Sequence, residues 1–302
     1  MKKLICTTTI NPPTTAIKKF ETMAGWDLVV TGDLKTPDYP LESGTYLSPQ
    51  DQEKRYPKLS EAIGWNCIQR RNIAILYAYE QGADIIAVVD DDNIPLDNWG
   101  KEIFLGRETK VNHYQCNDIA FDSVGATNAF PIWHRGFPLT LLSQRDYSNK
   151  SSKTITPDIQ ADLWNGDPDT DAIARMIYAP DITIEEKAFP LASNAFSPFN
   201  SQNTFISRRW IKDYFLFPGI GRMDDIWASY YLQSLGAKVL FNKPSVLHAR
   251  NEHDLLHDNK LEQLGHEKTL MLLQDLEKDP QAIWNYLPDQ AKKAFEIYLG
   301  CF

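Results

Sequence analysis

Residues 69–92 read QRRNIAILYAYEQGADIIAVVDDD, and this stretch decides the fold. Its first part has helical character and stops at Gly82, and glycine is the usual residue just past a helix C-terminus. The apolar run at 84–90 has the pattern of a parallel strand that is covered on both faces. Strand-like runs at 3–8 and 26–33 precede it, with a short helical segment between them. The order strand, helix, strand, helix, strand predicts a doubly wound α/β sheet.

The rest of the chain gives a coarser pattern. Residues 34–58 carry four prolines, and we predict a long loop there. A strand is expected at 203–207, followed later by a helix and a strand separated by Gly236. The chain then becomes mostly amphipathic and helical. We therefore expect a domain at 1–250 with a helical tail at 251–302 packed on it.

Composition excludes several classes of protein. The 302-residue chain has a net charge of −9, whereas nucleic-acid binding rests on a basic surface. The four cysteines form no CxxC, which argues against a zinc ligand set and a disulfide framework. No apolar run is long enough for a membrane span, and the N-terminal one is too short for a signal peptide. We expect a cytoplasmic protein with reduced thiols, no nucleic-acid partner and no membrane span.

Three adjacent carboxylates, Asp90, Asp91 and Asp92, follow the predicted central strand. Ligands of open α/β sheets bind at the carboxyl ends of strands. Converging carboxylates are best explained by a hard divalent cation, Mn²⁺ or Mg²⁺, which also takes substrate phosphates. Because side chains alternate along a strand, Asp90 and Asp92 are expected on one side and Asp91 on the other. The alternative is a polar loop in which one aspartate caps the next turn.

A second acidic pair, Asp224 and Asp225, begins a predicted helix. Aspartate is favoured there for structural reasons, because it meets free N–H groups and the positive end of the helix dipole. A positioned carboxylate can also act as a general base toward a reacting hydroxyl. Both interpretations stay open on the residues alone.

Six motifs occur along residues 4 to about 250 in the order of a known family. They are VVTGDLKTP, RRNIAILYAYEQGA, HRGFPL, DPDTDAIARM, SPFNSQNTFIS and DDIWASYYLQSLG. Together they resemble the STELLO-type glycosyltransferase domain. DDDN, RGFPLTLL, GRMDDIWA and VLHARN are also similar to the reversibly glycosylated polypeptides, which act on UDP-arabinose. The resemblance implies the A-type glycosyltransferase fold, a Rossmann-like mixed and mostly parallel sheet flanked by helices, with the helical tail added.

The resemblance also implies roles for individual residues. Asp92 and His248 would hold the metal, and Asp225 would be the base, supported by Asp224. Contacts to the donor nucleotide, phosphates or sugar are expected from Thr7, Thr8, Asp33, Arg71, Asp90, Asp91, Arg135 and Asn203, with Asn200 as a further candidate.

Each of these roles has a structural alternative. Arg71 suits a nucleotide because its cation is planar, but it can equally be a solvated helix residue paired with a carboxylate. A single histidine such as His248 is usually structural. Trp99, Trp133 and Trp227 could stack on a sugar, although core aromatics are commoner.

The combined prediction is a metal-dependent hexosyl- or pentosyltransferase. It would move a sugar from a nucleoside-diphosphate sugar, expected to be a UDP-sugar, to a hydroxyl acceptor such as a glycan. One alternative is a UDP-sugar mutase that interconverts pyranose and furanose rings. Another is a catalytically silent nucleotide-sugar-binding scaffold, against which the intact Asp90, Asp92 and His248 argue.

Overall fold

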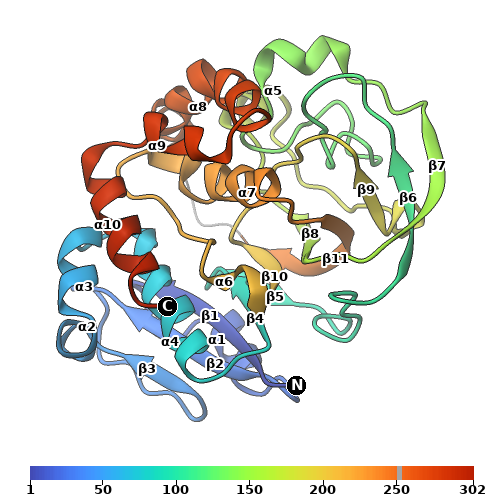
Figure 1. Cartoon of the computed structure of the whole chain (residues 1–302). Helices are drawn as coiled ribbons and strands as arrows, with labels where there is room; N and C mark the ends of the chain where they lie inside the picture. The colour runs from blue at the N-terminus through green and yellow to red at the C-terminus, as the bar shows by residue number, and fades with distance from the viewer. Residues whose placement is uncertain (250–253) are drawn as a thin grey trace.

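A mixed sheet runs through the molecule in the computed structural model, which describes residues 1–249 and 254–302 (Figure 1). Within these residues the strand order is β3-β2-β1-β4-β10-β8-β11-β9-β6-β7, and β5 pairs with β11. The strands are β1 Lys3–Thr9, β2 Asp27–Gly32, β3 Thr45–Leu47, β4 Ile85–Val89, β5 Asn93–Pro95, β6 Thr109–Tyr114, β7 Lys150–Ile155, β8 Ile159–Gly166, β9 Leu191–Ser193, β10 Asn203–Ser207 and β11 Val239–His248.

Helices flank this sheet and fill the C-terminal part of the chain (Figure 1). They are α1 Thr15–Glu21, α2 Pro49–Arg55, α3 Pro57–Ile63, α4 Arg71–Glu80, α5 Ala172–Tyr178, α6 Arg208–Ile211, α7 Asp224–Ser234, α8 Leu255–Leu276, α9 Ile283–Tyr286 and α10 Asp289–Leu299. The predicted α/β class, a mixed sheet flanked by helices with a helical C-terminal region, is confirmed.

The helix and strand predicted in residues 69–92 are α4 and β4. Gly82 has a φ of +79° just past α4, a conformation that favours glycine. All five residues of β4 are buried, as expected for a strand paired on both sides and covered on both faces. The parallel pairing of β4 with β1 brings the ends of these two strands together.

Strand directions bring four segments to one edge of the sheet. Strand β10 is antiparallel to both β4 and β8, and β8 is parallel to β11. The carboxyl ends of β4, β8 and β11 therefore lie at the same edge as the start of β10. The register pairs Asn203 with Val89, and Asn93 with His248. Side chains that follow β4 can thus meet side chains from residues 200–203 and from the end of β11.

The prediction of a long loop at 34–58 is wrong. This stretch contains β3 and α2 and leads into α3. Pro49 and Pro57 are first helical residues, where the missing N–H costs nothing. Ser48 and Asp51 form a capping box that begins α2. The prolines therefore start helices here instead of excluding them.

The C-terminal helices are built into the molecule through close backbone approaches. A Cβ at Gly221 would lie 2.2 Å from the carbonyl oxygen of Leu261 in α8, and Gly221 has a φ of +61°. A Cβ at Gly265 would lie 2.2 Å from the sulfur of Met223. Helix α10 contacts α3, so the C-terminal part also packs against the N-terminal part (Figure 1).

The predicted boundary between 1–250 and 251–302 lies outside the described residues. The end of the VLHARN motif and His253, which has no predicted role, also lie outside them. The division into two units stays a prediction.

Candidate functional site

Asp90 and Asp92 leave the end of β4 and take partners from distant parts of the chain. Asp90 forms an ion pair with Arg71 and stays 30% exposed. Burial raises the pKa of Asp90, the Arg71 guanidinium opposes this, and the Asp92 carboxylate adds to it. The Oδ2 atom of Asp92 lies 3.3 Å from Nε2 of His248. The structure therefore brings together the two residues predicted to hold a cation.

The carboxylate of Asp91 turns toward the segment after β1 and takes other partners than the carboxylates of Asp90 and Asp92. Its carboxylate accepts hydrogen bonds from Thr9 Oγ1 and from Asn11 Nδ2, the latter at 3.1 Å. Its backbone oxygen accepts from Thr14 Oγ1, and Thr14 also caps α1. The chain has left β4 by this point, so strand alternation no longer applies. Asp91 ties the segment after β1 to the segment after β4.

The chemistry around Asp92 fits a hard divalent cation. Its Oδ1 atom is buried and has no hydrogen-bond partner among the described residues. Two ligand atoms about 2.1 Å from an octahedral Mg²⁺ lie about 3 Å apart, close to the separation of Asp92 Oδ2 and His248 Nε2. Two protein ligands suit Mg²⁺ or Mn²⁺, which keep waters and take substrate phosphates.

Among the described residues, three side chains of the kinds that bind metals converge in one place, which lies outside this edge. They are Asp171, Glu262 and His266. Asp171 caps α5 through the Ile173 N–H, and Glu262 accepts from the Ala172 N–H at 2.8 Å. His266 Nε2 lies 2.9 Å from Asp171 Oδ2. Burial lowers the pKa of His266, but the Asp171 hydrogen bond and the charges of Asp171 and Glu262 together outweigh it, so the pKa is raised. These contacts join α5 to α8 and explain the cluster without a metal.

Arg71 is completely buried and bridges two parts of the site. Besides its ion pair with Asp90, its Nη1 donates to the backbone oxygen and to Oγ of Ser201, each at 2.7 Å. Because Arg71 is buried and Asp90 is partly exposed, a donor nucleotide would contact Asp90 before it contacted the Arg71 guanidinium. The predicted direct contact of Arg71 with the donor stays a prediction.

The segment at residues 200–203 joins the separate parts of the site. The backbone N–H and Oγ of Ser201 donate to Asp225 Oδ2 at 2.7 and 3.0 Å. The side chain of Gln202 lies 2.9 Å from Nδ1 of His248. This segment therefore connects the acidic pair of α7 with the residues after β4. Gln202 is a site residue that the sequence reasoning missed.

Asn203 lies deeper than its predicted role requires. It is 1% exposed, accepts from Trp99 Nε1 at 2.9 Å and donates to Ser245 Oγ at 2.9 Å. Trp99, Trp133 and Trp227 are all buried in the core. The interpretation of these tryptophans as core aromatics is confirmed.

The acidic pair at the start of α7 is buried, and its two members differ. Asp225 Oδ2 accepts from Nη2 of Arg135 at 3.2 Å, in addition to Ser201, and Asp225 Oδ1 lies 3.1 Å from Arg135 Nη1 in an ion pair. Asp224 accepts from Gln69 Nε2 at 2.6 Å. Burial and the neighbouring Asp225 carboxylate raise the pKa of Asp224 to about 7. A carboxyl group with this pKa is suited to exchange a proton near neutral pH.

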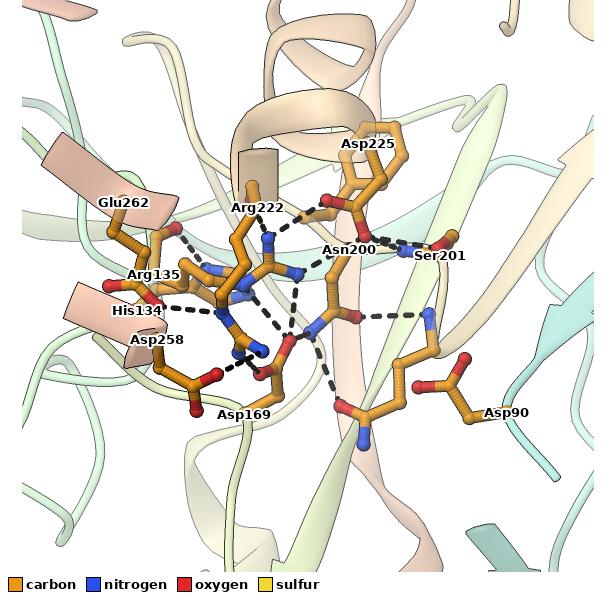
Figure 2. A network of polar contacts seen from close by, with 12 residues as sticks. Asp90, His134, Arg135, Asp169, Asn200, Ser201, Arg222, Asp225, Asp258 and Glu262 are labelled. Atoms are coloured by element: carbon orange, nitrogen blue, oxygen red, sulfur yellow. Dashed lines mark hydrogen bonds and ion pairs between the residues drawn. The ribbon is translucent and has the colours of Figure 1, made fainter. Parts of the chain in front are cut away.

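Arg135 is the centre of a buried network of charges (Figure 2). Its guanidinium lies between Asp225 and Asp169, with Nη2 2.8 Å from the Asp169 carboxylate. Arg222 contacts the other oxygen of Asp169 at 2.7 Å and Glu262 of α8 at 2.8 Å. Although burial favours the neutral form, the carboxylates hold the pKa of Arg135 well above its ordinary value. The arginine predicted to contact the donor is thus saturated by protein carboxylates.

The residues predicted at the ends of β1 and β2 are buried. Thr7 and Thr8 are 0% and 6% exposed. The carboxylate of Asp33 accepts backbone hydrogen bonds from Asn66 at 2.8 Å and Cys67 at 3.0 Å. Asp33 therefore fixes the chain segment that leads into α4, and its role toward a nucleotide base stays a prediction.

A cavity of about 850 Å³ lies away from this edge, at the C-terminal end of α7. Its walls include His113, Lys153, Asn194, Phe196 and Gln233. The side-chain amides of Asn194 and Gln233 are bonded to neighbouring backbone groups. None of the residues predicted for the site lines this cavity.

Within the described parts of the chain, every helix is too short or too polar to cross a membrane.

Comparison with known proteins gives two curated relatives, and no protein-family model matches the chain. The chain is 23% identical over 223 residues to the probable glycosyltransferase STELLO1 of Arabidopsis thaliana, covering 67% of this chain and 29% of that protein. It is 23% identical over 270 residues to the probable glycosyltransferase STELLO2, covering 81% of this chain and 35% of that protein. The chain spans about a third of the length of these relatives. The predicted resemblance to STELLO-type glycosyltransferases is confirmed.

Solved structures of glucosyl-3-phosphoglycerate synthase from Mycobacterium tuberculosis are also similar. The complex with phosphoglyceric acid has a TM-score of 0.48 and 13% identity, and covers 90% of this chain and 79% of that chain. The complex with Mn²⁺, UDP and phosphoglyceric acid has a TM-score of 0.49 and 12% identity, and covers 90% of this chain and 78% of that chain.

Proposed function

We propose that this chain is a metal-dependent glycosyltransferase that moves a sugar from a nucleoside-diphosphate sugar to a hydroxyl acceptor. The observation that carries the proposal is the meeting of Asp92 and His248 at the edge where β4 and β11 end, two residues after the partly exposed Asp90. The similarity to two probable glycosyltransferases supports the transferase class. A UDP-sugar is the proposed donor, on the resemblance of the motifs.

Asp92 and His248 would hold the cation, Mn²⁺ or Mg²⁺. When bound, the cation would neutralise charge on the leaving nucleoside diphosphate. Arg71 holds Asp90, the third residue of this edge, beside Asp92. Asp91 keeps the segment after β1 against the segment after β4, so that backbone from both strands faces a donor. We assign Asp90 to the donor ribose or to a water of the cation.

The acidic pair of α7 would serve the acceptor. A carboxylate near the attacking hydroxyl can take its proton. Asp225 accepts three hydrogen bonds from Ser201 and Arg135 and forms an ion pair with Arg135, whereas Asp224 accepts one hydrogen bond, from Gln69. Burial and the Asp225 charge also raise the pKa of Asp224 toward neutral pH, which suits proton exchange. We therefore propose Asp224 as the base and Asp225 as the residue that positions Ser201 and Arg135. This reverses the assignment expected from the motif.

The experiment is a thermal-unfolding panel of nucleoside diphosphates and their sugars, each with and without Mn²⁺. A ligand at one hundred times its Kd adds about 2.7 kcal/mol to the free energy of unfolding. The proposal expects a shift for uridine nucleotides that requires Mn²⁺. A Mn²⁺-dependent shift with guanosine nucleotides alone would overturn the donor assignment, and no shift with any nucleotide would overturn the transferase. Product analysis without an acceptor separates transfer from sugar-ring isomerisation.

A further inference from the structure

Three side-chain amides meet at Gln202, directly behind the carboxylates that follow β4. Gln202 is 1% exposed. Its Nε2 atom lies 2.9 Å from His248 Nδ1 and 3.0 Å from Asn93 Oδ1, and its Oε1 atom lies 3.3 Å from Asn200 Nδ2. The nitrogen and oxygen of such an amide are assigned from the surrounding hydrogen bonds, so the neighbours decide which way Gln202 points.

Groups of fixed character orient the two outer amides. The Nδ2 atom of Asn93 lies 2.8 Å from the backbone oxygen of Gln202, which can only accept. The Oδ1 atom of Asn200 lies 3.3 Å from the backbone N–H of Gln202, which can only donate. Asn200 Nδ2 also lies 3.3 Å from the carboxylate of Asp169, a second acceptor (Figure 2). Asn93 therefore presents its oxygen to Gln202, and Asn200 presents its nitrogen.

This arrangement fixes the proton on His248. The Gln202 side chain must direct its two N–H groups toward Asn93 Oδ1 and His248 Nδ1. A ring nitrogen that accepts a hydrogen bond carries no proton, so the neutral imidazole carries its proton on Nε2. Nε2 is the atom 3.3 Å from Asp92 Oδ2. In the cation-free protein His248 is thus a donor to Asp92.

A cation needs the opposite tautomer. An imidazole that ligates through Nε2 uses the lone pair of that atom and donates its Nδ1–H to an acceptor. In the present arrangement the Nδ1–H would meet an N–H group of Gln202, and two donors would face each other. The side-chain oxygen of Gln202 can accept from Nδ1 only after the amide turns by half a turn.

We infer that Gln202 is a positioning residue that selects the tautomer of His248 and thereby lowers the affinity of His248 for a cation. The inference rests on the proposed function in one respect, namely that His248 is the ligand. For a cation to bind, the side-chain amide of Gln202 must turn so that its oxygen, in place of its nitrogen, faces Nδ1 of His248. A residue that hydrogen-bonds to the non-ligating nitrogen of a metal-binding histidine typically changes the metal affinity by about 10–100-fold.

The test measures the tautomer directly, without activity. Two-bond ¹H–¹⁵N NMR spectra of the imidazoles distinguish a proton on Nδ1 from one on Nε2, and the His248→Gln variant identifies the signals of His248. The variants are Gln202→Glu, whose ionised carboxylate offers only acceptors to Nδ1, and Gln202→Met, which has similar length and offers neither donor nor acceptor. Mn²⁺ affinity is measured on the same three proteins by titration, with UDP present and absent.

The expected result is a proton on Nε2 of His248 in the unaltered protein, and on Nδ1 in Gln202→Glu. Gln202→Glu should bind Mn²⁺ about tenfold or more tightly than the unaltered protein, and Gln202→Met, which removes the donor without supplying an acceptor, should lie between the two. A proton on Nδ1 in the unaltered protein would overturn the inference and leave the proposed function intact. A changed tautomer in Gln202→Glu with unchanged Mn²⁺ affinity would overturn the link between tautomer and loading. Absence of Mn²⁺ binding in every variant, with the expected tautomers, would support the selection of the tautomer by Gln202 and overturn both its effect on a cation and the metal-dependent function.

Discussion

Two groups of adjacent aspartates lie close together in this molecule, and their surroundings differ. Asp90, Asp91 and Asp92 follow a strand at the edge of the sheet, and one buried oxygen of Asp92 has no partner in the described structure. Asp224 and Asp225 begin a helix and are each 4% exposed. Asp225 Oδ2 accepts hydrogen bonds from Ser201 and Arg135, whereas Asp225 Oδ1 accepts none among the described residues but lies 3.1 Å from Arg135 Nη1 in an ion pair.

The difference lies in what balances the charge. Around α7, Arg135 and Arg222 form ion pairs with Asp169, Asp225, Asp258 and Glu262, so each of these carboxylates has an arginine of the protein beside it (Figure 2). At the strand edge Arg71 balances Asp90, while the partner of the Asp92 carboxylate among residues 1–249 and 254–302 is a histidine. An acidic site whose carboxylate lacks a protein cation is expected to take a cation from outside, whereas around α7 the arginines hold Asp225 in place beside Asp224, the proposed base. Substitutions at the strand edge and in the network around α7 should therefore reduce different properties of the protein, activity in the first case and stability in the second.

The largest effect is expected from Asp92→Asn. This change removes the negative charge at the proposed cation site, and activity should fall by three or more orders of magnitude, or roughly 4 kcal/mol in transition-state stabilisation. Sugar release from the donor measures it. Asp97→Asn is the matched control, because Asp97 is exposed and lies five residues further along the chain. Near-full turnover of a folded Asp92→Asn protein would contradict the assignment of Asp92 to a cation site.

A smaller loss, in stability, is expected from Arg135→Met. It leaves Asp169 and Asp225 buried with too few cations, which typically costs about 3–5 kcal/mol of unfolding free energy. Chemical denaturation measures the loss. The control is Arg55→Met, whose ion pair with Glu80 is 45% and 35% exposed and is worth under about 1 kcal/mol. Equal losses of unfolding free energy for Arg135→Met and Arg55→Met would show that burial of the Arg135 network does not increase its contribution to stability.

Asp224→Asn should give an effect that depends on pH. The pKa of Asp224 is raised to about 7 in the folded protein, so the folded state holds its proton more strongly than the unfolded state. The stability from this group is present below about pH 4 and is lost as the pH rises toward 7. The uncharged variant escapes this loss and should exceed the unaltered protein by about 2–4 kcal/mol at pH 8, and by little at pH 4.

Asp162 provides the matched control for this prediction. It is also buried, burial raises its pKa to about 7, and it lies on β8 outside the proposed site. Asp162→Asn should show the same sign of pH dependence and keep the transferase activity, whereas Asp224→Asn should lose the activity. A flat stability difference between pH 4 and pH 8 for Asp224→Asn would contradict the raised pKa.

The N-terminal half of the fold could be predicted because its signals are local. The apolar run of β4, the glycine after α4 and the carboxylates after the strand lie within 24 residues of one another, at 69–92. The failure at 34–58 is also local, because proline was taken as a loop signal where it begins α2 and α3. The helical C-terminal region was predicted from its amphipathic pattern, but its close packing against Gly221 was not.

The site could be predicted only in part, because half of it is made of long-range contacts. Asp92 and His248 were recognisable from strand ends and motifs. Gln202 and Asp169 stand inside quoted motifs, yet nothing local distinguishes them from their neighbours. Their roles arise from partners 46 and 53 residues away, His248 and Arg222. Such roles appear only when the sheet order is known.

The central claim is that the carboxylates after β4 join a cation to a nucleoside diphosphate. The most direct test is calorimetric titration of UDP into the unaltered protein and into Asp92→Asn, each with and without Mn²⁺. The account predicts that Mn²⁺ tightens UDP binding to the unaltered protein by at least about tenfold, which is about 1.4 kcal/mol, and leaves binding to Asp92→Asn unchanged. An equal gain from Mn²⁺ in both proteins would contradict it.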